Sequence, residues 1–400
     1  MKIAARVALA FVLVTLVSCG ENRELRVLQR EQLFTVGYGV LEDQLNLFNL
    51  EGSGSPLKTR LAMRDGIFFI ANGNAGKVVT MSSFGDLLSM VYNPDKNPPP
   101  VILKSAETGA DVQGRLARQY PFNAPGEIAV DSRRTIFVEE RVPEERRSFD
   151  DASQSSLEYV VLRFSREGEY LDFLGQEGVG GTPFPLIASI HITPKDECVV
   201  VTITGEGWLV FWFDPNGMLL STIAVRRDGL PVPDTIDQAY PSLDGLALSP
   251  DGAGLLLKVD YFRDTIDADT KTRTGIEYAT SWAWVLDRTT GSFSEHYELP
   301  GFVSLVDNGT KERPVPRGWD FVGTARGAVF MSAVDDDGSL QYGVFDPESK
   351  TLSRFSLIID PDEMLYNCFH LSPEGILSGI LASRYEARIV WWRFDKVTGA

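Results

Sequence analysis

The sequence predicts an all-β fold, a six-bladed β-propeller closed by a strand from the N-terminus. Three observations lead to this prediction. Two families of tight turn alternate along the 400 residues, and each family has six members. Almost no stretch shows a sustained helical period, which argues against α/β folds. A spare strand near the N-terminus matches a strand that is missing at the C-terminus. Regularly repeated four-stranded units are the signature of a propeller.

The first turn family joins pairs of short apolar strands, such as Ala188–Ile192 and Cys198–Thr204. Gly, Pro, Asp and Ser are the residues whose backbone and side-chain chemistry favours tight turns. The six turns are centred on Arg64–Gly66, Asp131–Arg133, Thr193–Asp196, Ser249–Gly252, Ala325–Gly327 and Ser372–Gly375.

The second turn family is clearest in Trp208–Leu220, where aromatic and β-branched residues lead into the turn Asp214–Gly217. Most copies place Asp directly after an aromatic residue or Leu, and one has Ser in that place. The six turns follow Phe84, Phe164, Phe213, Leu286, Phe345 and Phe394.

The chain ends directly after the last turn of the second family, so the sixth blade lacks its outer strand. The apolar segment Leu33–Tyr38 has no partner in the first blade. Pairing it with Ala387–Phe394 closes the ring and removes two open sheet edges. We therefore expect the propeller to span residues 33–400.

One repeat resembles a known family. Phe164–Leu171, preceded by the Pro-Gly-Glu-Ile-Ala-Val-Asp run Pro125–Asp131, is similar to an NHL-type repeat. The resemblance implies a propeller of the kind found in uncharacterised bacterial envelope lipoproteins. It implies no particular function, because one fold hosts many.

The N-terminus resembles a bacterial lipoprotein signal peptide. Lys2 and Arg6 precede the apolar run Val7–Val17, which is too short to span a bilayer. The run Leu16–Cys19 is similar to a lipobox, which implies cleavage after residue 18 and a lipid-modified (diacylglycerol and palmitate) Cys19. An ordinary signal peptide with an incidental Cys is the alternative. Residues 19–32 would form a lipidated tether, and Gly20 leaves the outer membrane open as the destination if the host is Gram-negative.

The formal net charge of −17 argues against nucleic acid as a partner and against a protein lying flat on anionic lipid. We expect a monomer in the bacterial cell envelope. Cys198 and Cys368 occupy apolar strands three blades apart, which favours two buried free thiols. A disulfide in an oxidising compartment is the alternative.

Long segments are predicted to gather on one face of the ring. In a blade with alternating strand directions, both turn families lie on one face and all other connections on the opposite face. Long loops are often functional, so we predict that the second face binds a partner. A lid that merely covers the channel is the alternative. The long segments are Asn93–Asn123, Glu139–Leu157, Gly175–Pro185, Arg226–Ser242, Tyr261–Tyr278 and Pro300–Arg317.

The innermost strands begin at that face and should bring polar residues to the channel mouth. The candidates are Arg60, Glu127, Asp244, Trp319, Asp320 and Asn367. Carboxylates there could hold Ca²⁺ or another hard cation. The arrangement is similar to that of gluconolactonase-like six-bladed hydrolases, which implies a divalent-ion site of Glu, Asn and Asp. Polar residues that simply solvate a water-filled channel are the alternative, and we expect no other cofactor.

No catalytic motif accompanies these residues. The sequence has no Gly-x-Ser-x-Gly motif, and its three histidines show no zinc-ligand spacing. Asp335–Gly338 resembles part of a calcium loop but lacks the following Glu, so it is predicted to be a turn. The sequence therefore favours a non-enzymatic, membrane-anchored scaffold for an envelope protein, peptide or glycan. A divalent-metal-dependent hydrolase or lactonase is the second hypothesis.

Overall fold

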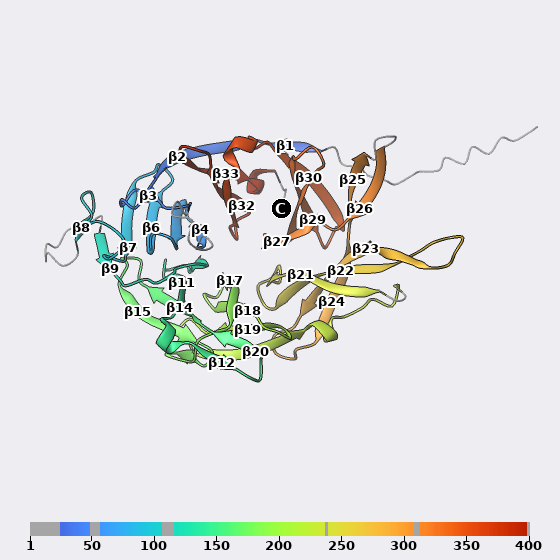
Figure 1. Cartoon of the computed structure of the whole chain (residues 1–400), viewed down its shortest axis with the longest axis horizontal. Coiled ribbons are helices and arrows are strands. Elements are labelled where there is room, and N and C mark those ends of the chain that lie inside the picture. The colour runs from blue at the N-terminus through green and yellow to red at the C-terminus, as the bar shows by residue number, and fades with distance from the viewer. Residues whose placement is uncertain (1–24, 49–56, 106–115, 237–238, 308–311, 398–400) are drawn as a thin grey trace, which may run out of the picture.

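Six sheets of antiparallel strands form a ring in the computed structural model, which describes residues 25–48, 57–105, 116–236, 239–307 and 312–397. Figure 1 shows the six sheets arranged in a ring. The innermost strands are β4 (Thr59–Arg64), β10 (Ile128–Val130), β17 (Leu186–Ile192), β21 (Tyr240–Leu248), β27 (Asp320–Ala325) and β31 (Tyr366–Leu371). The second strands are β5 (Ile67–Asn72), β11 (Ile136–Arg141), β18 (Cys198–Ile203), β22 (Leu255–Ile266), β28 (Ala328–Val334) and β32 (Ile376–Ala382). The six-bladed propeller is confirmed.

Each blade is completed by a third and a fourth strand. The third strands are β6 (Lys77–Ser82), β14 (Tyr159–Phe164), β19 (Gly207–Phe213), β23 (Arg273–Leu286), β29 (Leu340–Asp346) and β33 (Ala387–Arg393). The fourth strands are β7 (Leu87–Tyr92), β15 (Tyr170–Gly175), β20 (Leu219–Arg226), β24 (Phe293–Leu299), β30 (Thr351–Leu357) and, in blade 6, β2 (Arg30–Tyr38).

Short accessory strands extend the blades or form hairpins between them. They are β1 (Arg26–Leu28), β3 (Gln44–Leu45), β8 (Lys104–Ser105), β9 (Leu116–Gln119), β12 (Ser148–Asp150), β13 (Ser155–Leu157), β16 (Gly178–Val179), β25 (Phe302–Asp307) and β26 (Glu312–Arg317). The described helices are single 3₁₀ turns: η2 (Glu144–Arg146), η3 (Arg227–Gly229), η4 (Pro361–Glu363) and η5 (Phe394–Lys396). In the described part of the chain, no helix is long and apolar enough to cross a bilayer.

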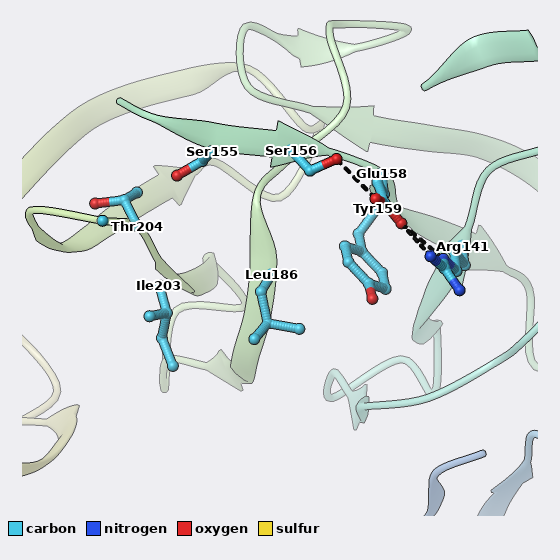
Figure 2. A pocket seen from close by; sticks show the side chains of 9 residues that line it. Arg141, Ser155, Ser156, Glu158, Tyr159, Leu186, Ile203 and Thr204 are labelled. Atoms are coloured by element: carbon cyan, nitrogen blue, oxygen red, sulfur yellow. Dashed lines mark hydrogen bonds and ion pairs between the residues drawn. The ribbon is translucent and has the colours of Figure 1, made fainter. Parts of the chain in front are cut away.

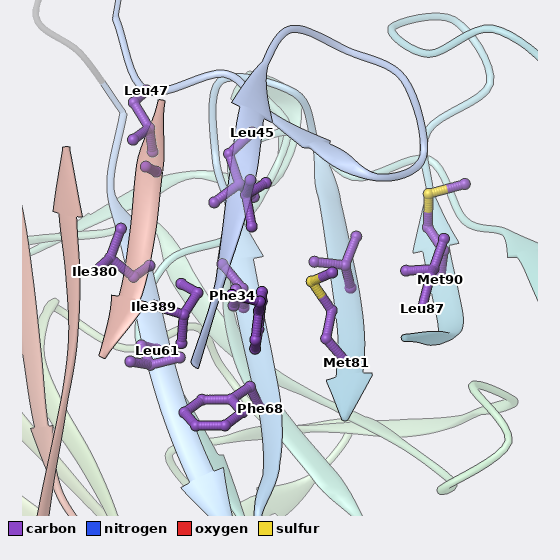
Figure 3. Close-up of a cluster of buried hydrophobic side chains, with 14 of the residues drawn as sticks. Phe34, Leu45, Leu47, Leu61, Phe68, Met81, Leu87, Met90, Ile380 and Ile389 are labelled. Atoms are coloured by element: carbon purple, nitrogen blue, oxygen red, sulfur yellow. The ribbon is translucent and has the colours of Figure 1, made fainter. Parts of the chain in front are cut away.

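The N-terminal strand closes the ring as the sequence predicts. β2 pairs antiparallel with β33, with Val36 opposite Ala387 and Arg30 opposite Trp392. Its Phe34 enters the core between blades 6 and 1, where its ring meets the Phe68 ring edge-on at 5.8 Å (Figure 3). The ring is therefore closed by hydrogen bonds and by buried apolar surface.

The propeller begins earlier than residue 33. β1 adds to blade 5 in parallel with β30, and β2 begins at Arg30. Residues 26–28 and 30–32 are therefore part of the sheets, although the sequence predicts a tether over 19–32. The sequence prediction misses these residues because they are polar. Polar segments can still form backbone hydrogen bonds with a neighbouring strand, as β1 does with β30 and β2 does with β33. Residues 1–24, including Cys19, lie outside the described residues.

The turn chemistry is that expected of the two families. The carboxylate of Asp214 accepts the backbone N–H groups of Asn216 and Met218. Ser165, which replaces Asp in its copy, accepts the N–H groups of Glu167 and Glu169 through its hydroxyl. Local side-chain acceptors thus fix these turns.

The two cysteines of the propeller are buried and free. Burial raises the pKa of Cys198 to about 12 and that of Cys368 to about 11. The prediction of two buried free thiols in different blades is confirmed.

Candidate functional site

The starts of the inner strands place charged side chains at the mouth of the channel, on the face opposite the short turns. These side chains form two separate groups. One lies over blades 1 to 3 around Lys58, and the other lies over blades 4 and 5 around Lys258. We call them the Lys58 group and the Lys258 group.

The Lys58 group joins three blades through one ammonium. Lys58 immediately precedes β4 of blade 1, and its Nζ lies 2.8 Å from Glu139 Oε2 and 3.0 Å from Oε1 in blade 2. The same Nζ donates to the backbone carbonyl of Ile187 in blade 3 at 3.1 Å. Beside it, Arg60 Nε donates to Glu127 Oε1 at 2.8 Å.

Glu139 is the buried centre of this group. Its side chain is 2% exposed, and it also accepts the backbone N–H of Glu127 at 2.8 Å. Burial raises the pKa of Glu139, and Lys58 opposes that rise. A Cβ at Gly126 would lie 2.6 Å from Glu139 Oε2, so only glycine allows this close approach.

A β-bulge builds the Lys258 group. The register of β21 on β22 shifts between Leu243 and Gly245, which leaves Asp244 as the extra residue. Its carboxylate accepts from Lys258 Nζ at 3.0 Å and from the backbone N–H of Phe321 in the next blade at 2.8 Å. The bulge therefore aims Asp244 across the boundary between blades 4 and 5.

Two further carboxylates complete the Lys258 group. Asp260 Oδ1 accepts from the fully buried Lys258 at 2.6 Å and from the Ser281 hydroxyl at 2.5 Å. Asp320 is exposed at the start of β27, and partial desolvation together with nearby Asp244 raises its pKa. The single ammonium of Lys258 therefore lies near three carboxylates, those of Asp244, Asp260 and Asp320.

The structure places the six predicted mouth residues in four different situations. Arg60 and Glu127 form one ion pair, and Asp244 and Asp320 belong to the other group. Asn367 is exposed on β31, and among the described residues its side chain has no hydrogen-bond partner. The sequence could not show this division, because it depends on which cations the neighbouring blades supply.

Trp319 does not lie at the mouth. It is 2% exposed in the core between blades 4 and 5, where its ring meets Phe302 at 4.9 Å and the Arg354 guanidinium at 5.9 Å. The prediction for this residue is wrong because the large indole is more stable in the apolar space between the blades.

The mouth carboxylates do not converge as a metal site requires. Within the described ranges, no group of three or more His, Cys, Asp and Glu is arranged to hold a metal ion. The inner-strand histidines His191 and His370 are held neutral, since burial lowers both pKa values to about 4. His370 accepts the Met63 N–H through Nδ1 at 3.3 Å.

A cleft that the sequence does not predict lies between blades 2 and 3, next to the Lys58 group. It has a volume of about 320 Å³. Figure 2 shows hydroxyl groups, an Arg–Glu pair and apolar side chains around it. Its lining includes Arg141, Ser156, Glu158, Tyr159, Leu186 and Thr204. Only the packing of two blades and the β12–β13 hairpin brings these residues together, so no sequence motif marks them.

The long segments fall on one face, and three of them form or contain antiparallel hairpins. Tyr261–Tyr278 is an extension of the β22–β23 hairpin that projects beyond the ring (Figure 1). Pro300–Arg317 forms the β25–β26 hairpin, and Glu139–Leu157 contains the β12–β13 hairpin. These insertions are hairpins and not irregular loops, because their strands pair with each other.

Comparisons with known proteins give remote similarities. No family model matches the chain, and no curated protein matches it. Among solved structures, a Dos1 propeller has 10% identity and a TM-score of 0.36, and the match covers 89% of this chain and 81% of the other. A luciferin-regenerating enzyme has 9% identity and a TM-score of 0.36, and the match covers 84% of this chain and 90% of the other. A PL25 ulvan lyase has 10% identity and a TM-score of 0.40, and the match covers 91% of this chain and 96% of the other. Similarities this remote say nothing about function, and the fold rests on the strand pairing.

Proposed function

We propose that this chain is a lipid-anchored, non-enzymatic propeller of the bacterial cell envelope. It presents its long-insertion face to a protein, peptide or glycan partner and carries the lipid on Cys19. The acidic surface keeps the tethered domain soluble above the membrane.

The observation that carries the proposal is the one-sided placement of the insertions. In all six blades the connection between the first and second strands is short. The connection between the third and fourth strands is also short in blades 1 to 5, while the fourth strand of blade 6 is β2 from the N-terminus. The β12–β13 and β25–β26 hairpins and the extension of β22–β23 all belong to the other face. Insertions that enlarge one face of the ring, beside the charged residues of the channel mouth, are the arrangement expected of a binding surface.

The ion pairs at the mouth favour binding over metal-dependent hydrolysis. Glu127 and Glu139 already face Lys58, while Asp244 and Asp260 face Lys258. A divalent ion would have to compete with these ammonium groups for the same oxygens. The hydrolase hypothesis therefore has less support from this geometry.

Partner capture from envelope extract tests the proposal. The full-length protein in detergent is compared with a variant in which Asn-Gly replaces Asp264–Ile276, which keeps the Arg263–Glu277 strand pair. A second variant replaces Phe149–Ser156 in the same way and keeps the Ser148–Leu157 pair. We expect one or both variants to lose the captured partner.

The matched control changes the opposite face. Replacing Pro347–Lys350 by Asn-Gly shortens the β29–β30 turn and leaves the Asp346–Thr351 pair intact. This variant should capture the same partners as the natural protein. An unchanged partner set in both insertion variants would contradict the proposal.

The lipid anchor has its own test. Cells grown with an alkyne-labelled palmitate should label the natural protein, and Cys19→Ala should remove both the label and the membrane association. Labelling that persists in Cys19→Ala would show that this residue is not the anchor.

A further inference from the structure

The cleft between blades 2 and 3 combines an apolar floor with polar walls. Leu186 and Ile203, paired across β17 and β18, supply the floor, and Leu186 remains 44% exposed. Exposed apolar surface beside polar groups suits a ligand that has both apolar and polar surfaces.

The hydroxyl groups of the walls can accept hydrogen bonds from a ligand. Ser156 donates its proton to Glu158 at 2.7 Å, and Thr204 donates to the Gly207 carbonyl at 3.3 Å. Because each hydroxyl already donates its proton within the protein, its oxygen can act towards a ligand only as a hydrogen-bond acceptor.

Arg141 and Tyr159 supply donors. Arg141 uses Nε to bind Glu158 at 2.7 Å and approaches the same carboxylate through Nη2, which leaves further N–H groups. The hydroxyl of Tyr159 has no hydrogen-bond partner among the described residues and can donate or accept.

The charge of the cleft is balanced. Arg141 and Glu158 neutralise each other, so the lining attracts neither an anion nor a cation strongly. The acidic chain as a whole disfavours an anionic ligand. A volume of about 320 Å³ is at the small end of ligand sites.

We propose that this cleft binds a neutral saccharide of about one or two sugar rings. The apolar C–H face of a ring lies on Leu186 and Ile203. Its hydroxyls donate to Ser156 and Thr204 and accept from Arg141 and Tyr159. The assignment rests on the proposed function, since it names a glycan as the ligand class of the insertion face.

Isothermal titration of the full-length protein tests the assignment, in a detergent without a sugar headgroup. The probes are cellobiose, maltose, lactose and N,N′-diacetylchitobiose, with digalacturonate as the anionic comparison. We expect at least one neutral disaccharide to bind. Tyr159→Phe should weaken binding about tenfold through the loss of one hydrogen bond. Leu186→Glu should abolish binding, because a carboxylate would replace the apolar floor.

Both variants should fold, since the Tyr159 hydroxyl has no partner in the described part of the chain and Leu186 is exposed. Their matched controls are Tyr385→Phe (80% exposed) and Leu220→Glu (49% exposed), which lie outside the cleft lining and should bind the disaccharide normally. A thermal melt of each variant checks that folding is unchanged.

Three results would overturn the assignment: no neutral disaccharide binds, both cleft variants bind as the natural protein does, or digalacturonate alone binds. Each of them is compatible with successful partner capture, which would preserve the binding function and discard the saccharide. An unchanged partner set in both insertion variants, together with disaccharide binding by the natural protein, would discard the proposed partner face and preserve the saccharide assignment.

Discussion

Arg30 and Glu363 are 333 residues apart in the chain and form an ion pair at the seam of the ring. Arg30 begins the closing strand β2, and Glu363 ends η4 in blade 6. The carboxylate of Glu363 also accepts from Arg388 on β33, and its side chain is only 5% exposed. One buried carboxylate therefore holds two guanidinium groups from the two paired strands of the seam.

Glu363→Gln should weaken the closure of the ring. Two partly buried cations would lose their shared anion, and we expect the free energy of unfolding to fall by about 2–3 kcal/mol. Urea denaturation measures this loss. The control is Glu31→Gln, which affects the more exposed pair with Lys396 and should cost less than about 1 kcal/mol. Equal losses in the two variants would contradict a special role for Glu363.

Glu140 should make the protein less stable as the pH rises towards neutrality. Burial raises the pKa of Glu140 to about 7 from an ordinary value of 4.5. Oε1 accepts the N–H groups of Asn123 and Ala124, while the buried Oε2 has no hydrogen-bond partner in the described ranges. Between pH 4.5 and 7 the folded protein holds a proton that the unfolded chain has released. Stability therefore falls through this window, by up to about 3 kcal/mol.

Glu140→Gln tests this pH dependence because the amide stays neutral at every pH. The variant should match the natural protein at acidic pH, where Glu140 is protonated in both states, and be more stable than it above neutrality. Urea denaturation across the range measures the difference. Glu145→Gln, at an exposed site in η2, should reproduce the natural curve. A Glu140→Gln curve parallel to the natural one would show that Glu140 is not the titrating group.

Gly126→Ala should disturb the Lys58 group. The added Cβ would lie 2.6 Å from Glu139 Oε2 and 3.1 Å from Lys58 Cδ. Moving the buried Glu139 carboxylate away from Lys58 should cost about 1–3 kcal/mol. Gly275→Ala is the control, because a Cβ added at Gly275 would have no atom within 4 Å, and it should change stability by less than about 0.5 kcal/mol. A Gly126→Ala variant as stable as this control would mean that the Lys58 group adjusts freely.

Much of the fold follows from local chemistry, which explains why the sequence predicts it. Asp214 and Ser165 fix their turns through neighbouring N–H groups, and alternating turns of two kinds determine the order of strands. The spare strand Leu33–Tyr38 is recognisable because a closed ring needs a partner for Ala387–Phe394.

The arrangement of the site depends on contacts between blades, which local patterns do not contain. No local pattern marks the bulge that turns Asp244 towards Phe321, or the reach of Lys58 to Glu139. Trp319 shows the same limit, since a residue next to a mouth carboxylate points into the core. The blade 2–3 cleft exists only where an insertion of one blade meets the next.

Calcium should leave the stability of the natural protein unchanged, because Lys258 already occupies the space between Asp244 and Asp260. Thermal melts with CaCl₂ and with EDTA should coincide. Lys258→Met removes the ammonium and leaves the carboxylates facing one another, at a cost of about 3–5 kcal/mol. Ca²⁺ prefers carboxylate oxygens, so it should restore part of that loss in this variant alone. Stabilisation of the natural protein by Ca²⁺, removed by Asp244→Asn, would instead favour the metal-dependent hydrolase.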